Sequence, residues 1–369
     1  MSVLLFLLIL VSLIVVHELG HFAAAKFFGI RVDEFGIGFP PRLFGRKWGE
    51  TMYTVNLLPF GGFVKIFGED GEAVALAPED AKRSFIEKSR PIQAAVLVAG
   101  VFMNIITAWL ILSVGFMVGL PESSADSQYG ALKNIQPTVV QISPNSPASD
   151  KGIETGDHVQ QIAALPSETI SGDSGSDKLR EFIAAHADED LTVTLERGGV
   201  VRTVIAKPSS GISGAPEGKK VLGIDLVDVG TLRLPIHKAL FAGAVLTKDL
   251  TVATAVGLYD FAKTIVVGKA DFSTVSGPVG IVGVVGQASQ LGLAAVLTLA
   301  AVIAVNLAII NLIPFPALDG GRLLIVLIEA VRRKPIPQKL SLWVNAGGFA
   351  VLIVLMIVVT YHDIAKLFI

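Results

Sequence analysis

Two histidines and a glutamate lie close together near the start of the chain, in the run His17-Glu18-Leu19-Gly20-His21. Side chains four residues apart share one face of a helix, so both histidines can reach a single metal ion. Glu18 can then accept a proton from water held by that ion. The run lies inside an apolar segment, where ionisable side chains are expensive unless they are paired or coordinated. The pattern predicts a catalytic metal centre, with a signal peptide or plain membrane anchor as the alternative.

A third ligand is expected much later in the chain. A catalytic zinc ion typically takes three protein ligands and keeps one position open, and the chain has no cysteine to supply one. Asp319 follows an apolar segment that ends at Pro314 and Pro316, and Gly320-Gly321 permits a sharp turn behind it. We expect Asp319 to complete the centre. In isolation, the alternative is an N-cap for a helix that begins near Arg322.

These residues belong to a chain with the composition of a membrane protein. It has 369 residues, 52% hydrophobic and 17% charged, with a mean hydropathy of +0.64, whereas soluble proteins average about 25% charged residues. The net charge of -2 gives no reason to expect nucleic-acid binding. We expect four spans, within residues 1–25 and at about 92–119, 292–313 and 342–360.

The first apolar run is expected to stay in the mature protein. It lacks a basic region in front, and cleavage after 23–25 would discard both histidines. From Val3 to His17 a helix rises about 21 Å, which places His17 roughly two-thirds of the way through a hydrocarbon core of ~30 Å. Positive residues follow the first and third spans, so both exits are expected in the cytoplasm. Asp319 then arrives on the same side as the histidines, which favours the ligand interpretation over the N-cap.

The parts between the spans also give predictions. Residues 52–66 predict two short strands joined at Pro59 and Gly61-Gly62, a hairpin whose free edge could pair with an extended substrate; an ordinary soluble hairpin is the alternative. Residues 234–267 are amphipathic in parts and are expected at the membrane interface, although a spanning helix stays open. The predicted divisions are 1–119, 120–233, 234–291 and 292–369.

Residues 120–233 have the composition of a soluble domain outside the membrane. Helix-like pieces are expected at 148–151 and 178–185, and strands at 138–142, 158–163, 191–197, 200–206 and 221–226. Ser143-Pro144-Asn145-Ser146-Pro147-Ala148 followed by Gly156-Asp157-His158-Val159 resembles a PDZ domain of the bacterial protease type. Such modules bind extended peptides by adding a strand at a sheet edge. His158, His186 and His237 are expected to be surface or turn residues rather than metal ligands.

Three motifs together resemble the site-2 protease family of intramembrane zinc metalloproteases, in the bacterial branch similar to the regulator of sigma-E protease. They are His17-Glu18-Leu19-Gly20-His21, Gly100-x-Phe102-x-Asn104 and Asn311-x-x-Pro314-x-Pro316-x-Leu318-Asp319-Gly320. The chain departs from the sigma-E protease in having one PDZ-like domain instead of two, so it resembles a single-PDZ subgroup. Any model that needs a two-PDZ size filter is therefore in doubt.

The resemblance implies one zinc ion held by His17, His21 and Asp319, with Glu18 as general acid and base. It also implies substrate-handling residues at the hairpin and after the third span, and residues packed beside the active site on the second span. The first group is Gly61, Gly62, Phe63, Asn311, Pro314 and Pro316, and the second is Gly100, Phe102 and Asn104. For Asn104, the residues alone favour a contact that holds helices together.

The expected fold is a polytopic α-helical membrane protein with a membrane-associated β-hairpin and one inserted PDZ-like α+β domain. The expected activity is hydrolysis of peptide bonds in or near the transmembrane segments of single-span proteins, with zinc-bound water as nucleophile. Family analogy suggests anti-sigma-factor-like proteins or remnant signal peptides as substrates, a bacterial inner-membrane location, an active site near the cytoplasm and a PDZ-like domain outside it. A peptide or substrate segment would bind that domain. The alternatives are a non-catalytic membrane-anchored PDZ scaffold and a transporter, which often shows internal repeats that this sequence lacks.

Overall fold

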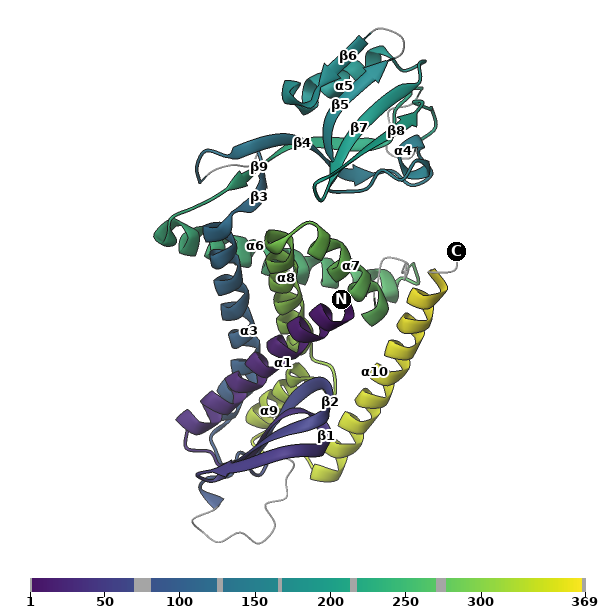
Figure 1. Ribbon diagram of the computed structural model, residues 1–369. Coiled ribbons are helices and arrows are strands. Elements are labelled where there is room, and N and C mark those ends of the chain that lie inside the picture. The colour runs from purple at the N-terminus through teal and green to yellow at the C-terminus, as the bar shows by residue number, and fades with distance from the viewer. Residues whose placement is uncertain are drawn as a thin grey trace. The chain divides into compact units, whose positions relative to one another are not determined.

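A computed structural model describes residues 2–69, 81–124, 129–164, 168–212, 218–269 and 277–366. The chain divides into two compact units (Figure 1). The first unit contains residues up to 112, 243–287 and from 297 onwards, and the second contains 113–242 and 288–296. Each unit is built on its own hydrophobic core.

The first unit is formed mainly by long apolar helices. Within the described residues, five helices are long and apolar enough to cross a membrane, at Ser2–Phe27, Arg90–Val118, Ile236–Ile265, Leu293–Leu312 and Lys339–Ala365. The chain is therefore organised as a membrane protein with additional β-structure. The helices are α1 (Ser2–Phe27), α3 (Arg90–Val118), α6 (Ile236–Val266), α7 (Pro278–Gln290), α8 (Leu293–Leu312), α9 (Asp319–Arg332) and α10 (Gln338–Lys366).

Helices α1 and α3 approach unusually closely because glycines lie where they meet. A Cβ atom added at Gly20 would lie 2.4 Å from the carbonyl oxygen of Ala99, a separation that real Cβ atoms do not tolerate. Small residues at such crossings let helix backbones touch in a membrane, where apolar side chains gain little from leaving lipid. The close approach presses the His17 and His21 face of α1 against α3, and both imidazoles are buried.

The predicted hairpin at 52–66 is wrong as a pairing, although its strands exist. Strand β1 (Val32–Trp48) and strand β2 (Thr51–Ile66) form one sheet, and residues 34–37 pair with 52–55 on one side and with 62–65 on the other. The two halves of β2 therefore do not pair with each other, because the first part of β1 lies between them. Residues 62–66 form one edge of this sheet, which lies beside α1 in Figure 1.

Helix α6 nearly coincides with the helical segment expected at 234–267, for which both an interfacial and a spanning position were left open. It runs for 31 residues and meets the length and composition of a span. Thr254 on α6 donates a hydrogen bond to Asn306 of α8, at 3.2 Å, so the two helices are in contact at this point. Helix α7 is much shorter, with 13 residues, and Asp363 of α10 accepts the N–H groups of Gly277 and Gly280 at its start.

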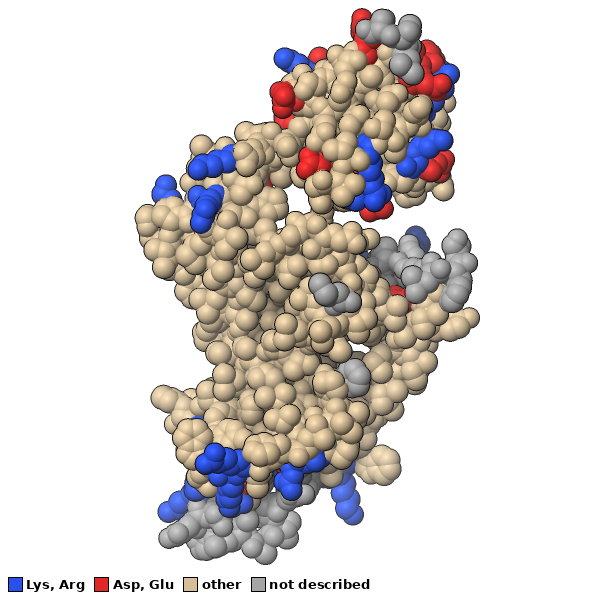
Figure 2. Space-filling view, viewed as in Figure 1, with Lys and Arg blue, Asp and Glu red and all other residues tan. Residues whose placement is uncertain are grey.

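Charge is distributed unevenly over the first unit. Figure 2 shows Lys and Arg gathered at the end of the unit that carries β1 and β2, while the helices above this end present an uncharged surface. An uncharged belt beside a basic rim is the pattern that the positive-inside rule predicts for a cytoplasmic face. The basic rim includes Lys26, Arg31 and Arg83, of which Lys26 and Arg83 both contact Glu50.

The second unit is built on a seven-stranded sheet with strand order β3-β9-β4-β5-β7-β8, and β6 pairs with β5. The strands are β3 (Leu120–Ser123), β4 (Lys133–Ile142), β5 (His158–Ala164), β6 (Glu168–Ser171), β7 (Leu191–Arg197), β8 (Val200–Ala206) and β9 (Ile224–Leu232). Short helices α4 (Pro147–Asp150) and α5 (Ser176–Ala185) and the 3-10 turn η1 (Gly172–Ser174) complete it.

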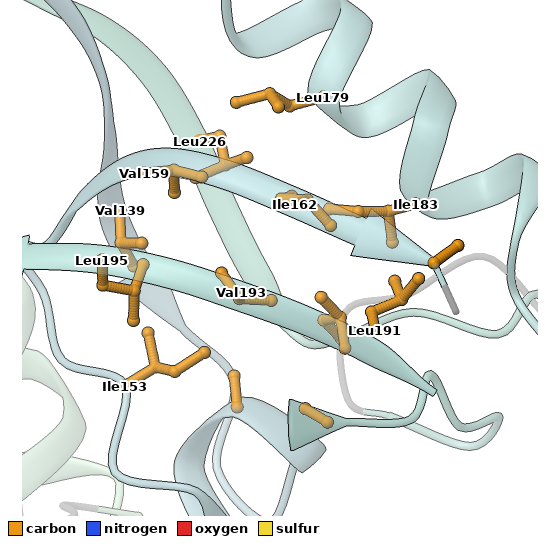
Figure 3. Packing of buried hydrophobic residues seen from close by; sticks show 14 residues of the cluster. Val139, Ile153, Val159, Ile162, Leu179, Ile183, Leu191, Val193, Leu195 and Leu226 are labelled. Atoms are coloured by element: carbon orange, nitrogen blue, oxygen red, sulfur yellow. The ribbon is translucent and has the colours of Figure 1, made fainter. Parts of the chain in front are cut away.

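Alternation along the strands places the core of this unit. In β7, Leu191, Val193 and Leu195 are buried while their neighbours are more exposed, and they pack with Leu179 and Ile183 of α5 (Figure 3). Strands β7 and β8 occupy the predicted residues, whereas β9 begins and ends later than the expected 221–226. His158 begins β5, where its Nδ1 atom lies 2.8 Å from the Thr138 hydroxyl.

Candidate metal centre

Three side chains from opposite ends of the sequence converge in the first unit. The Nε2 atoms of His17 and His21 lie 3.2 Å apart. Asp319 Oδ2 lies 2.9 Å from the first nitrogen and 3.2 Å from the second. Tetrahedral zinc with bonds of about 2.0–2.1 Å holds its ligand atoms about 3.3 Å apart. The observed separations therefore match a three-ligand set around one ion.

The hydrogen bonds of the neutral imidazoles also suit a metal ion at this position. His21 Nδ1 lies 2.8 Å from the carbonyl oxygen of Val96, which can only accept a proton, so Nδ1 carries the hydrogen and Nε2 presents a lone pair. If His17 is neutral in the same way, its Nε2 atom, His21 Nε2 and Asp319 Oδ2 are all acceptors, and no hydrogen lies between them. A metal ion at their centre removes this repulsion, and imidazole with carboxylate is a donor set that suits zinc.

His17 has a comparable partner in Asn104. The Asn104 amide nitrogen lies 3.2 Å from His17 Nδ1, the side chain is fully buried, and its Oδ1 atom has no partner among the described residues. A flip of the Asn104 side-chain amide exchanges its oxygen and nitrogen positions without changing the packing. Oδ1 then faces the His17 ring and accepts the Nδ1 hydrogen. That orientation leaves His17 Nε2 as a lone pair toward Asp319.

Gly100 makes room for both imidazoles. A Cβ atom at this position would lie 2.4 Å from His21 Nε2 and 2.8 Å from His17 Nε2. Both rings are already held from behind, by Val96 and Asn104, so neither can move away. The glycine on α3 is therefore a steric requirement of the ligand geometry, and the prediction that Gly100 packs beside the centre agrees with its position.

The turn after α8 places Asp319. It is the first residue of α9, and the N-cap is Leu318, whose side chain makes no cap hydrogen bond. A Cβ atom at Gly320 or Gly321 would lie 2.2 Å from a carbonyl oxygen of the preceding loop, so only glycine permits this tight return. Ala317 adopts a left-handed conformation with φ of 74°, an uncommon one for a residue with a side chain.

A pocket of about 470 Å³ opens beside the three side chains. Its wall includes Glu18 and residues 63–66 of the edge strand. The space at Gly62 faces Glu18, because a Cβ atom there would lie 3.5 Å from Glu18 Cγ. Phe63 stacks on Phe39, with ring centroids 6.3 Å apart. The carboxylate of Glu18 and the edge of the sheet therefore face one cavity beside the three converging atoms.

Of the remaining predicted site residues, one reaches the metal centre and the others lie elsewhere. Asn311 reaches the centre, with its amide nitrogen 3.5 Å from His17 Nε2. Pro316 packs toward α10 instead, because a Cβ atom at Gly348 would lie 2.4 Å from it. Pro314 lies in the loop before Asp319. Phe102 is 60% exposed, so its ring lies on an exposed face of α3, and its packing beside the centre stays a prediction.

Two features of the site have no signal in the motifs. Val96 contributes a backbone carbonyl, which any residue type could supply. Phe39 reaches the pocket from β1, which sequence reasoning left outside the predicted hairpin. Its position could have been inferred only from the pairing of residues 34–37 with both halves of β2.

Comparison with known proteins finds a peptidase family and relatives named as zinc metalloproteases. The model of peptidase family M50 matches residues 5–355. A Clostridium perfringens protein provisionally named a zinc metalloprotease is 39% identical over 96% of this chain and 95% of its own length. The regulator of sigma-W protease RasP of Bacillus subtilis is 28% identical over 100% of this chain and 99% of its own. The zinc metalloprotease RasP of Geobacillus kaustophilus is 28% identical over 100% and 98%.

Proposed function

This chain belongs to peptidase family M50, the site-2 protease family, and is a zinc metalloprotease of that type; from this premise we propose that it cleaves single-span membrane proteins within or near their transmembrane segments. The observation that carries the proposal is the meeting of His17, His21 and Asp319 beside a pocket that also holds Glu18. A non-catalytic scaffold would have no need of this set.

One zinc ion per chain is proposed at this centre, held by His17, His21 and Asp319. When bound, zinc polarises the scissile carbonyl and lowers the pKa of its water toward about 7. The protein's own residues fix the three donor atoms: Val96 and Asn104 hold the imidazoles from behind, and the Gly320-Gly321 turn brings the carboxylate to them.

Glu18 is proposed as the general acid and base. Its carboxylate faces the pocket from the helical turn that carries both histidines, so it can take the proton of the attacking water. It then delivers this proton to the nitrogen of the leaving amine as the peptide bond breaks. The products are a new carboxyl terminus and a new amino terminus, which accounts for every atom of the water.

The edge strand is proposed to hold the substrate. A transmembrane helix protects its own carbonyl groups, so a substrate must unwind before its peptide bond can be attacked. Residues 62–66 are paired on one side only within the described sheet, and they line the pocket. Pairing with this edge would satisfy the unwound backbone. Gly61, Gly62, Phe63 and Asn311 are the proposed substrate contacts, with Pro314 and Pro316 shaping the loop beside them.

Four crossings of the membrane are proposed, although five helices are long enough. The metal ligands lie in the second half of α1 and just after the end of α8, and Val96 near the start of α3 contacts His21. Helices α1 and α8 therefore exit on the side where α3 begins. The chain between α3 and α8 must therefore leave and return on the opposite side. If α6 crossed, α7 would have to cross back, but its 13 residues span only about 20 Å of a ~30 Å core. We therefore assign α6 to the interface, with both termini outside.

The basic rim around β1 and β2 supports a cytoplasmic position for the metal centre. Residues 120–233 are then extracytoplasmic, and we assign them as one PDZ-like domain inserted between α3 and α6. Its sheet edges offer a place for a peptide or a substrate segment. By analogy with a relative named for sigma-W regulation, the proposed substrates are anti-sigma-factor-like proteins or remnant signal peptides in a bacterial cytoplasmic membrane.

The test uses purified full-length protein in vesicles with a single-span substrate. Wild-type protein with one equivalent of zinc is expected to cleave it, to stop after chelation and to recover when zinc is restored. Glu18→Gln is expected to keep its zinc and lose cleavage, because only the proton carrier changes. Normal turnover by Glu18→Gln, or turnover by a chain without zinc, would overturn the proposal.

A further inference from the structure

A second pocket of about 480 Å³ lies in the first unit, next to the pocket of the metal centre. It is lined by the turn at 85–87, the first turns of α3, one face of α9 and the start of α10. Three residues, Glu69, Leu97 and Arg322, line both pockets. The two cavities are therefore neighbours that share one boundary, and Arg322 and Glu69 form an ion pair across it.

The edge strand leads from the first pocket toward the second. Gly62 faces Glu18 at one end of the strand. Beyond the other end, Phe67 accepts a hydrogen bond from the backbone N–H of Phe85, at 2.9 Å. Phe85 begins the turn that forms a wall of the second pocket. A substrate strand paired with 62–66 would be carried along this edge to the shared boundary, and its next residues would meet the second pocket.

The chemistry of the second pocket suits a peptide better than a lipid tail. Phe85, Ile325 and Val326 give it an apolar floor, whereas Ser341 and Asn345 supply hydrogen-bonding groups. Its acidic groups are Glu69, Glu87 and Glu329, and Glu329 pairs with Arg90 at 2.7 Å. A hydrocarbon chain in this pocket would keep water away from these charged and polar groups, which is unfavourable. A peptide with apolar and basic side chains would satisfy both kinds of surface.

We propose that this pocket binds the juxtamembrane flank of the substrate, as an extended segment that carries apolar and basic residues. Transmembrane segments are followed on the cytoplasmic side by Lys and Arg. The charged lining of the pocket is three Glu against Arg90 and Arg322, and this net negative charge complements such a flank. The Arg322–Glu69 ion pair lies at the boundary between the pocket of the metal centre, which holds the reacting bond, and the second pocket, which holds this flank. The inference rests on the proposed function, since it assigns a second subsite to the same substrate.

Cross-linking can test the subsite because the chain has no cysteine of its own. Full-length Glu18→Gln protein would carry one cysteine, at Ile336 in the second pocket, at Phe63 in the first, or at Val331. Val331 lies on α9 outside both pockets and is 84% exposed, so it is the matched control. Single cysteines along a single-span substrate then report which segment lies beside each position.

We expect Ile336→Cys to form disulfides with the charged flank of the substrate, and Phe63→Cys with positions nearer the membrane core. Val331→Cys should form few with either. Disulfides at Phe63 without any at Ile336 would overturn the subsite while leaving the proposed function standing. No preference of Ile336→Cys for the flank would point to a lipid-filled pocket and overturn it as well. Absence of disulfides at both positions would overturn the strand pairing together with the subsite.

A functional measurement gives an independent check. Ile325→Trp fills the second pocket, and Leu327→Trp adds the same ring to the exposed side of the same helix. The first variant should raise KM about tenfold for a substrate with its flank and leave KM unchanged for one cut short before the flank. Zinc content should stay at one equivalent in both variants. Equal KM values for the two variants on the full substrate would contradict the subsite.

Discussion

Gly100→Ala is the sharpest perturbation that the metal centre offers, because it adds one methyl group to the site. The added carbon would lie 2.4 Å from His21 Nε2 and 2.8 Å from His17 Nε2, whereas ordinary van der Waals contact begins at about 3.4 Å. One ring must therefore move by about 1 Å, while metal–ligand distances tolerate only about 0.2 Å. Hydrogen bonds to Val96 and Asn104 oppose that movement.

We expect zinc affinity to fall at least about 100-fold, which corresponds to about 2.7 kcal/mol at 1.36 kcal/mol for each factor of ten. Competition with a chelator of known affinity measures the loss, and far-UV circular dichroism checks that the helices persist. Gly347→Ala is the matched control, since nothing lies within 4 Å of its added carbon on α10. Zinc binding by Gly100→Ala within threefold of wild type would refute the steric reasoning.

Three further predictions concern other parts of the chain. Asn104→Ala should weaken zinc binding about 10–100-fold, because His17 loses the acceptor for its Nδ1 hydrogen, while Asn104→Asp should bind within a few fold of wild type in the same chelator competition. Gly62→Val should slow cleavage and leave zinc content unchanged, because its side chain enters the space before Glu18; equal rates would count against the edge strand. Arg197→Met leaves Asp157, whose side chain is 1% exposed, without its ion-pair partner at 2.6 Å, so residues around β5 should lose about 3–5 kcal/mol of protection in hydrogen exchange.

The three metal ligands could be predicted because their residue types and spacing are visible in the sequence. His17 and His21 are four residues apart on one helix, and Asp319 follows a loop whose prolines and glycines allow only a sharp turn. Hydropathy then predicts that α1 and α8, the helix before Asp319, span the membrane. Basic residues after both helices predict that the two exit on the same side. The convergence of these three residues follows from patterns that a single sequence contains.

Other features depend on tertiary pairing that a single sequence does not encode locally. Residues 52–58 and 62–66 have the composition of strands, but only the fold places residues 32–39 between them. Phe102 and Asn104 are two positions apart on α3, so they point in different directions, and burial alone separates the exposed ring from the buried amide beside His17. Helix α6 shows a further limit, because its length and hydropathy permit a crossing, whereas the proposed topology of four spans places it at the interface.

The central claim is that this centre hydrolyses a peptide bond inside a membrane segment. The most direct measurement is mass spectrometry of the products from a single-span substrate incubated in H₂¹⁸O with zinc-loaded protein. The account predicts a junction within or beside the apolar segment, one ¹⁸O atom in the new carboxyl group and no product from Glu18→Gln. A junction confined to a soluble loop, or the same product from Glu18→Gln, would contradict it.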